Sequence, residues 1–209
     1  MAQSSHRWTE EIQGREEQRH LKREALLQTA ARIFNQVGFH QTTLDDLAKA
    51  LNVTKPTLYY YIKNKDDILF ECQRLALERL QGILELTQGK GTNGLEKLRF
   101  FFFQYAESIT EDFGICLILS GDQPLIKENR LKLSTHRKEI NQAVCQLIEE
   151  GIADGSIAPC DPRMTTFALF GAFNWIAHWY HEEGELSPHQ ITEQFLSVFQ
   201  NGLIPRHPC

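Results

Sequence analysis

The sequence predicts an all-α protein of about nine helices in two parts, residues 17–63 and residues 64–204. Apolar residues recur at helical spacing through most of the chain, and capping residues precede most of these segments. No segment shows the alternation of apolar and polar residues that marks a half-buried strand. A chain of 209 residues is long enough for one large domain or two modest ones.

The first helix is expected to run from about Glu17 to Val37. Its apolar stripe consists of Leu26, Ala30, Ile33, Phe34 and Val37. Gly38 ends this helix, because glycine readily takes the left-handed conformation of the residue that follows a helix. Residues 1–15 are polar, and we expect them to be largely disordered.

The next segment reads as two short helices joined by a tight turn, which is the pattern of a helix-turn-helix. Thr43, followed three residues later by Asp46, is a capping box that starts the first helix. Asn52 ends it, since asparagine tolerates a left-handed backbone. Thr54 can cap the second helix, and Pro56 is allowed in its first turn, where backbone N–H groups lack intrahelical partners.

The second short helix is rich in hydroxyl groups and cationic at its N-terminal end, which suits insertion into the major groove of DNA. Lys55 can donate to guanine, while Thr57 and the ring of Pro56 can touch thymine methyl groups. Lys65 can hold a phosphate together with the backbone N–H groups of a helix start. The ring of Tyr59 can pack against the protein while its hydroxyl reaches a phosphate, so its role stays open. The candidate DNA-contacting residues are Thr43, Thr54, Lys55, Pro56, Thr57, Tyr59, Tyr60, Tyr61 and Lys65.

This segment resembles the DNA-binding motif of the TetR/AcrR family of bacterial transcription regulators. The matching positions are Thr42, Thr43, Leu44, Leu47, Ala48, Val53, Thr57, Leu58, Tyr59, Ile62, Lys65 and Ile68. Asn52 stands where the family usually has glycine, and Ile62 where it has phenylalanine. The resemblance, which covers about the first third of the chain, implies a three-helix DNA-binding domain at 17–63. It also implies that a helical domain at 64–204 dimerises and binds an effector.

Capping residues also mark the first helices of the second part. Asn64 caps a long helix that continues to about Thr87, with acidic residues in its first turn, as the helix dipole favours. Asn93 and Glu96 start the next helix, which carries phenylalanine at each of positions 100–103. Four consecutive side chains point nearly all round a helix, so we expect this helix at the centre of the domain.

Three further helices follow a break at Gly121 and Pro124. They are expected at about Asn129–Ala153, Asp161–His181 and Ser187–Gly202. The last two begin with a capping residue followed by proline at the first helical position. Because both are apolar on more than one face, we expect them to pair with their copies in a homodimer, as an isologous four-helix contact.

Two faces of helix 161–181 are candidates for a cavity wall and a subunit interface. One face carries Phe167, Phe170, Asn174 and His178, and the other carries Ala168, Ala172, Trp175 and Trp179. Which face has which role stays open. The candidate ligand-binding residues are Phe102, Tyr105, Asn174 and His178. Either Asn174 or His178 could meet the polar end of a ligand among apolar walls, and the alternative is that both are hydrogen-bonded residues of a packed bundle.

The residues from Asn174 to Pro188 also resemble the corresponding part of acyl-CoA-responsive members of the family. This resemblance implies an acyl-CoA or related lipid-derived effector, with a hydrophobic drug or aromatic compound as the alternative. A coenzyme A thioester needs cationic partners for its phosphates, and the second part of the chain has few clustered lysines and arginines.

Charge and cysteine content limit the class of protein. Residues 1–65 hold ten Lys and Arg against seven Asp and Glu, whereas the remaining residues hold twelve against twenty. A basic head on an acidic body is typical of a DNA-binding protein whose body has another role. Five cysteines without a C-x-x-C pair argue against a disulfide framework or a zinc site and favour the cytoplasm. No stretch approaches the roughly 20 apolar residues of a membrane span.

No catalytic, metal or cofactor site is predicted. His178 and His181 have helical spacing for a metal, but no third ligand is obvious. Phosphate loops, nucleophile elbows and Ser-His-Asp spacings are not found in the sequence.

The predicted function is that of a ligand-responsive, DNA-binding transcriptional regulator. We expect a homodimeric repressor, with an activator as the alternative, which a hydrophobic small molecule releases from a pseudo-palindromic double-stranded operator. Two rivals belong to other classes. An architectural DNA-binding protein would have a filled body without a cavity, and an enzyme built on a helical bundle would need a paired carboxylate or metal set.

Overall fold

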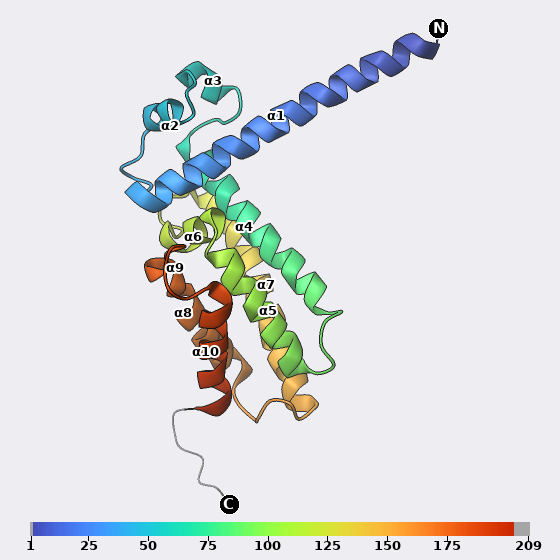
Figure 1. Cartoon of the computed structure of the whole chain (residues 1–209), viewed down its shortest axis with the longest axis vertical. Helices are drawn as coiled ribbons and strands as arrows, with labels where there is room; N and C mark the ends of the chain where they lie inside the picture. The colour runs from blue at the N-terminus through green and yellow to red at the C-terminus, as the bar shows by residue number, and fades with distance from the viewer. Residues whose placement is uncertain (1, 203–209) are drawn as a thin grey trace, which may run out of the picture.

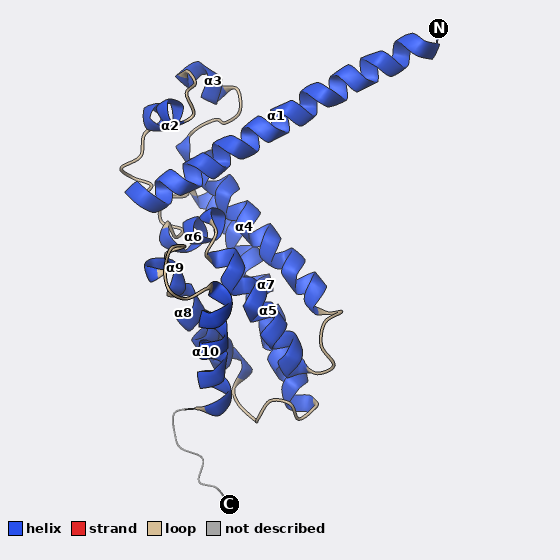
Figure 2. Ribbon diagram, in the orientation of Figure 1, coloured by secondary structure: helices blue, strands red, loops and turns tan. Residues whose placement is uncertain are grey.

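The computed structural model describes residues 2–202 of the chain, and the side chains of residue 14 and residues 16–202. Within this range the chain forms ten helices and no strand (Figures 1 and 2), which confirms the predicted all-α class. The helices are α1 (Ala2–Val37), α2 (Leu44–Ala50), α3 (Lys55–Tyr59), α4 (Lys65–Thr87), α5 (Gly94–Ile109), α6 (Asp112–Leu119), α7 (Lys127–Ala153), α8 (Pro162–Asn174), α9 (Ile176–Trp179) and α10 (Pro188–Asn201). Within residues 2–202 no helix is long and apolar enough to cross a membrane.

The first helix is longer than the sequence pattern indicated. α1 begins at Ala2 rather than at about Glu17, so the expectation of disorder is wrong for residues 2–15. Residues 2–37 contain no proline and a single glycine, Gly14, and they are rich in Glu, Gln and Arg, which favour helix. Figure 1 shows the N-terminal half of α1 projecting away from the other helices.

Four helices of the second part of the chain start with side-chain caps at the predicted residues. Asn64 accepts the backbone N–H of Asp67 at 2.8 Å, and Asn93 accepts that of Glu96 at 2.9 Å. The caps of the last two long helices are formed by Asp161, which accepts from Met164 at 3.0 Å, and by Ser187, which accepts from Gln190 at 3.2 Å. Local sequence therefore decides where these helices begin.

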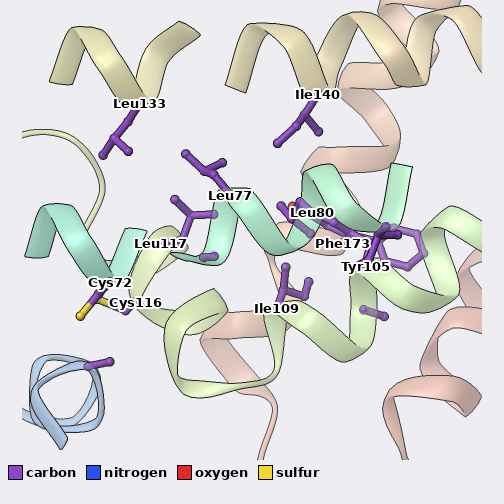
Figure 3. Packing of buried hydrophobic residues seen from close by; sticks show 14 of the residues in the cluster. Cys72, Leu77, Leu80, Tyr105, Ile109, Cys116, Leu117, Leu133, Ile140 and Phe173 are labelled. Atoms are coloured by element: carbon purple, nitrogen blue, oxygen red, sulfur yellow. The ribbon is translucent and has the colours of Figure 1, made fainter. Parts of the chain in front are cut away.

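The phenylalanine-rich helix α5 lies at the centre of the body, as predicted. It contacts α4, α6, α7, α9 and α10, and both Phe101 and Phe102 are fully buried. Figure 3 shows Leu77 and Leu80 of α4 between Ile140 of α7 and Ile109 of α5. A continuous apolar core thus joins the long helices of residues 65–153.

Two breaks interrupt helices that the sequence pattern left continuous. α5 ends at Ile109, and the chain turns sharply into α6 at Asp112. A Cβ atom on Gly114 would lie 2.0 Å from the carbonyl oxygen of Ser108, so this turn requires glycine there. The predicted helix 161–181 is also divided, because α8 ends at Asn174 and the short α9 follows.

Candidate DNA-binding surface and ligand cavity

The helix-turn-helix begins with the predicted capping box. The hydroxyl of Thr43 accepts the backbone N–H of Asp46 at 3.2 Å, and the Asp46 carboxylate accepts the backbone N–H of Thr43 at 2.9 Å. The hydroxyl and backbone N–H of Thr43 both lower the pKa of Asp46. Asn52 takes the left-handed conformation in the turn, with φ +53°, as its residue type predicted.

Helix α3 is anchored on one side and exposed on the other. Leu58 is buried, whereas Lys55, Pro56 and Thr57 are exposed. The predicted side-chain cap by Thr54 does not form, because its hydroxyl hydrogen-bonds to the hydroxyl of Thr57 at 2.9 Å. The exposed side of α3 therefore presents small polar groups around the start of the helix.

Most of the candidate DNA contacts are exposed. Tyr60 is 65% exposed, and the guanidinium carbon of Arg19 in α1 lies 5.3 Å from its ring centroid, which adds a cation that the sequence pattern did not single out. The exposed candidates are Thr43, Thr54, Lys55, Pro56, Thr57, Tyr59 and Tyr60. The Lys55 ammonium pairs with the Asp45 carboxylate at 2.9 Å, so a base contact by Lys55 requires this exposed pair to open. Tyr61 is half-buried against the core.

Lys65 has partners inside the protein. Its ammonium donates to the carbonyl oxygens of Phe39 at 2.7 Å and Thr42 at 2.8 Å, with a longer contact to His40 at 3.4 Å. It also lies 4.3 Å from the centroid of the Phe39 ring, and burial lowers the pKa of Lys65. All three N–H donors are thus engaged, and a phosphate contact would replace a bond that ties the loop before α2 to the start of α4.

A cavity of about 480 Å³ lies in the body of the protein. Its walls come from α4 to α8 and from the turn after α6: Leu77, Leu80, Tyr105, Leu117, Ile118, Gly121, Asp122, Gln123, Arg137, Ile140, Asn141, Phe170 and Asn174. This volume falls in the range of small-molecule sites, roughly 300–1,000 Å³. The face of α8 that carries Phe170 and Asn174 is therefore the cavity face.

Two of the four predicted ligand-binding residues meet at this cavity. The hydroxyl of Tyr105 donates to the side-chain oxygen of Asn174. Burial raises the pKa of Tyr105 well above its usual value, so the phenol stays neutral. Their bond occupies the oxygen of Asn174 and leaves the tyrosine hydroxyl oxygen as a possible acceptor at the wall.

The other two predicted residues lie elsewhere. Phe102 is fully buried behind the wall and packs against Phe173, with ring centroids 4.6 Å apart. His178 is exposed and stacks on Trp175 at 4.5 Å, so the prediction that it lines the cavity is corrected. His178 belongs to the short α9, and its ring lies against Trp175 and not at the cavity wall.

The charged part of the cavity wall was missed by sequence reasoning. The guanidinium of Arg137 in α7 pairs with the carboxylate of Asp122 in the turn after α6, and it also donates to the side-chain oxygen of fully buried Gln73 at 3.0 Å. Gln73 in turn donates to the carbonyl oxygen of Gly121 at 2.9 Å. Arg137 lies in a charged helical stretch that offers no motif, so its sequence carried no signal.

Helix α6 connects the cavity wall with α1. The carboxylate of Asp112 accepts from Gln28 at 2.7 Å and from Arg32 at 3.1 Å, while its backbone carbonyl accepts from Asn35 at 2.9 Å. The other end of α6 supplies Leu117 to the cavity wall. One short helix therefore touches both the cavity and the helix that packs against the helix-turn-helix.

An apolar surface covers the C-terminal helices. Large apolar side chains of α8–α10 are exposed, and they are Met164, Phe167, Trp175, Trp179, Val198 and Phe199. These side chains are the candidates for the predicted subunit contact. In the part of the chain that the structure describes, no group of three or more His, Cys, Asp or Glu is placed to hold a metal ion.

Two family models match the chain. One, described as bacterial regulatory proteins of the tetR family, matches residues 26–72, and the other, described as the tetracyclin repressor-like C-terminal domain, matches residues 91–203. The HTH-type transcriptional repressor KstR2 of Mycolicibacterium smegmatis is 27% identical over 185 residues, which cover 87% of this chain and 90% of that protein. KstR2 of Rhodococcus jostii is 25% identical over 189 residues, covering 89% and 93%.

Solved structures agree with this similarity. The TetR family regulator PfmR from Thermus thermophilus superposes with a TM-score of 0.80 at 27% identity, covering 86% of this chain and 99% of PfmR. AibR in complex with isovaleryl coenzyme A and operator DNA superposes with a TM-score of 0.76 at 26% identity, covering 84% and 96%. The similarity thus extends through both the helix-turn-helix and the body.

Proposed function

Because the chain belongs to the TetR family of bacterial regulatory proteins, we propose that it is a repressor released from its operator by a small molecule. The observation that carries this proposal is the pairing, in one chain, of an exposed α3 surface with a separate cavity of about 480 Å³. Residues 17–63 bind DNA in this proposal, and residues 64–204 bind the effector and dimerise. Such a protein acts in the cytoplasm, where its operator is.

The proposed DNA contacts are the exposed candidates together with half-buried Tyr61. Lys55, Pro56, Thr57 and Tyr60 read base edges in the major groove, while Thr43, Thr54, Tyr59 and Tyr61 contact the sugar–phosphate backbone. Two copies of α3 in a homodimer would lie about one helical turn apart, roughly 34–36 Å, on a pseudo-palindromic operator. The apolar surface of α8–α10 is the proposed subunit contact.

The proposed effector has a hydrophobic body. The cavity offers apolar walls and the Tyr105–Asn174 pair as a polar group within them. An acyl-CoA is supported by the resemblance of residues 174–188 and by the isovaleryl coenzyme A bound in AibR. A hydrophobic drug or aromatic compound is the alternative.

The proposed response depends on differential affinity. An effector that binds more tightly to a dimer with another spacing of its α3 helices lowers the affinity of the dimer for its operator. The operator in turn lowers the affinity of the dimer for the effector, by the same factor. Helix α6 offers the route, because it lines the cavity through Leu117 and holds α1 through Asp112.

Two measurements test this function. Binding-site selection from random duplex DNA should return a pseudo-palindrome, and fluorescence anisotropy on that operator should then show release by a member of a panel of acyl-CoAs, fatty acids and aromatic compounds. A selected palindrome that no small molecule affects would favour an architectural protein without an effector. Failure to select any sequence would contradict the repressor.

A further inference from the structure

We infer that the cavity recognises a ligand with an apolar body and an anionic group, and that this group displaces Asp122 from Arg137. The inference rests on the proposed function and deepens it, since it names the chemical class of the effector and its recognition residue. The observation behind it is a charged pair on an otherwise largely apolar wall.

Arg137 is the cation of this cavity wall. Asp122 and Arg137 are the two charged residues at this wall, and they pair with each other. Their side chains are 36% and 26% exposed, respectively, so both remain within reach of solvent and of a ligand. An arginine fork binds carboxylate and phosphate oxygens with matched geometry, which makes an anion the group that this wall selects.

Gln73 keeps the arginine in place during such an exchange. Its side-chain oxygen accepts from one terminal nitrogen of Arg137 at 3.0 Å, while the other terminal nitrogen pairs with Asp122, and its amide donates to Gly121 at 2.9 Å. Gln73 is fully buried, so its position is determined by packing. The guanidinium therefore stays oriented toward the cavity when its carboxylate partner changes.

The exchange also changes the contacts of the turn after α6. Asp122 belongs to the turn between α6 and α7, and it anchors that turn to α7 through Arg137. A competing anion frees the Asp122 side chain, while Gly121 stays bonded to Gln73 and the apolar body of the ligand fills the space beside Leu117 and Ile118. Ligand binding thereby acts on the end of α6. A neutral compound of the same shape fills the apolar space but does not release Asp122.

The anionic group can come from two sources, a free carboxylate or a coenzyme A phosphate. Calorimetry with hexanoate, decanoate and phenylacetate, each beside its methyl ester and its coenzyme A thioester, separates them. Binding of the acids but not the esters identifies the carboxylate, and binding of the thioesters alone identifies the phosphate. Equal affinity for acid, ester and thioester would overturn the inference.

Paired variants assign the effect to Arg137. Asp122→Asn removes the competitor and should raise affinity for the anionic probe, whereas Arg137→Gln with Asp122→Asn should lower it by about tenfold relative to Asp122→Asn alone. Neither of these two variants should change the affinity for the methyl ester. The matched control is Lys97→Gln with Glu150→Gln. It neutralises another ion pair of α7, whose ammonium and carboxylate lie 2.8 Å apart outside the cavity. This control should leave the ratio of acid affinity to ester affinity unchanged.

The result distinguishes this inference from the function on which it rests. If an ester binds as well as its acid in every variant and still releases operator, the anion requirement is wrong and the repressor survives. If operator is selected but no probe of any class binds, both the anion inference and the effector response fail. Thermal unfolding of each variant confirms that a lost affinity is not a lost fold.

Discussion

Substituting Lys65 with methionine separates two roles that predict opposite results. In the structure the ammonium joins the loop before α2 to the start of α4, through the carbonyl oxygens of Phe39 and Thr42. The sequence pattern instead suggested a phosphate contact. Methionine keeps an unbranched apolar stem beside the Phe39 ring and removes only the charged donor.

The cost of this change can be worked out from the geometry. Hydrogen bonds to charged groups contribute about 1.5–3 kcal/mol each, and Lys65 makes two short ones. The freed carbonyl oxygens lie in a surface loop where His40 and Gln41 are exposed, so water replaces part of the loss. A net destabilisation of about 2 kcal/mol follows, which corresponds to about 4–8 °C in the unfolding midpoint.

The assay combines thermal unfolding with the salt dependence of binding to random-sequence duplex DNA. We expect Lys65→Met to unfold at lower temperature while the slope of log affinity against log salt stays at the wild-type value. Lys63→Met is the matched control, because it removes the same charge from an exposed neighbour. A slope reduced by about one unit with unchanged stability would refute the structural role and restore the phosphate contact.

The remaining predictions concern recognition, acid stability and assembly. Thr57→Ala or Tyr60→Ala should change the operator consensus at about 1–3 kcal/mol per lost base contact, and an unchanged consensus after binding-site selection would contradict this. The pKa of Asp46 is lowered from its ordinary value of 3.8, so its stabilisation is present above that pH and is lost as the pH falls through the lowered pKa. Thr43→Ala should reduce this acid dependence in denaturant titrations, because it removes the hydroxyl donor and keeps the backbone N–H that also bonds to Asp46. Trp175→Glu should raise the dimer dissociation constant about tenfold or more in sedimentation, since each copy brings a charge into the apolar contact, and an unchanged dimer would place the interface elsewhere.

Helix starts were predictable because their determinants are local. A cap such as Asn64 or Ser187 bonds to a backbone group three residues away, so a short stretch of sequence contains the whole interaction. The same holds for Asn52, whose left-handed backbone follows from its own side chain. The exposed side of α3 was likewise evident from residue types close together in the chain.

The cavity wall was predictable only in part, because it is assembled from distant segments. Arg137 meets Asp122 and Gln73 from separate helices and a turn, and no spacing in the sequence reports that meeting. His178 was misplaced because its spacing from Asn174 did not reveal that its ring stacks on Trp175 outside the cavity. The partners of Lys65 are backbone carbonyls, which carry no sequence signature at all.

The unpredicted break before α6 is also what makes the proposed response physically reasonable. No break was predicted between Asn93 and Gly121. Had α5 continued through Asp112, residues 112–119 would form the end of one long central helix. The turn that Gly114 permits makes this segment a separate helix of eight residues, about 12 Å long. Its first residue holds Gln28 and Arg32 of α1, and its far end faces the cavity and the turn of Asp122. In the proposed response a displacement at the cavity would pass to α1 through these direct contacts of α6, even though α6 also packs against α5, where Phe101 and Phe102 are fully buried.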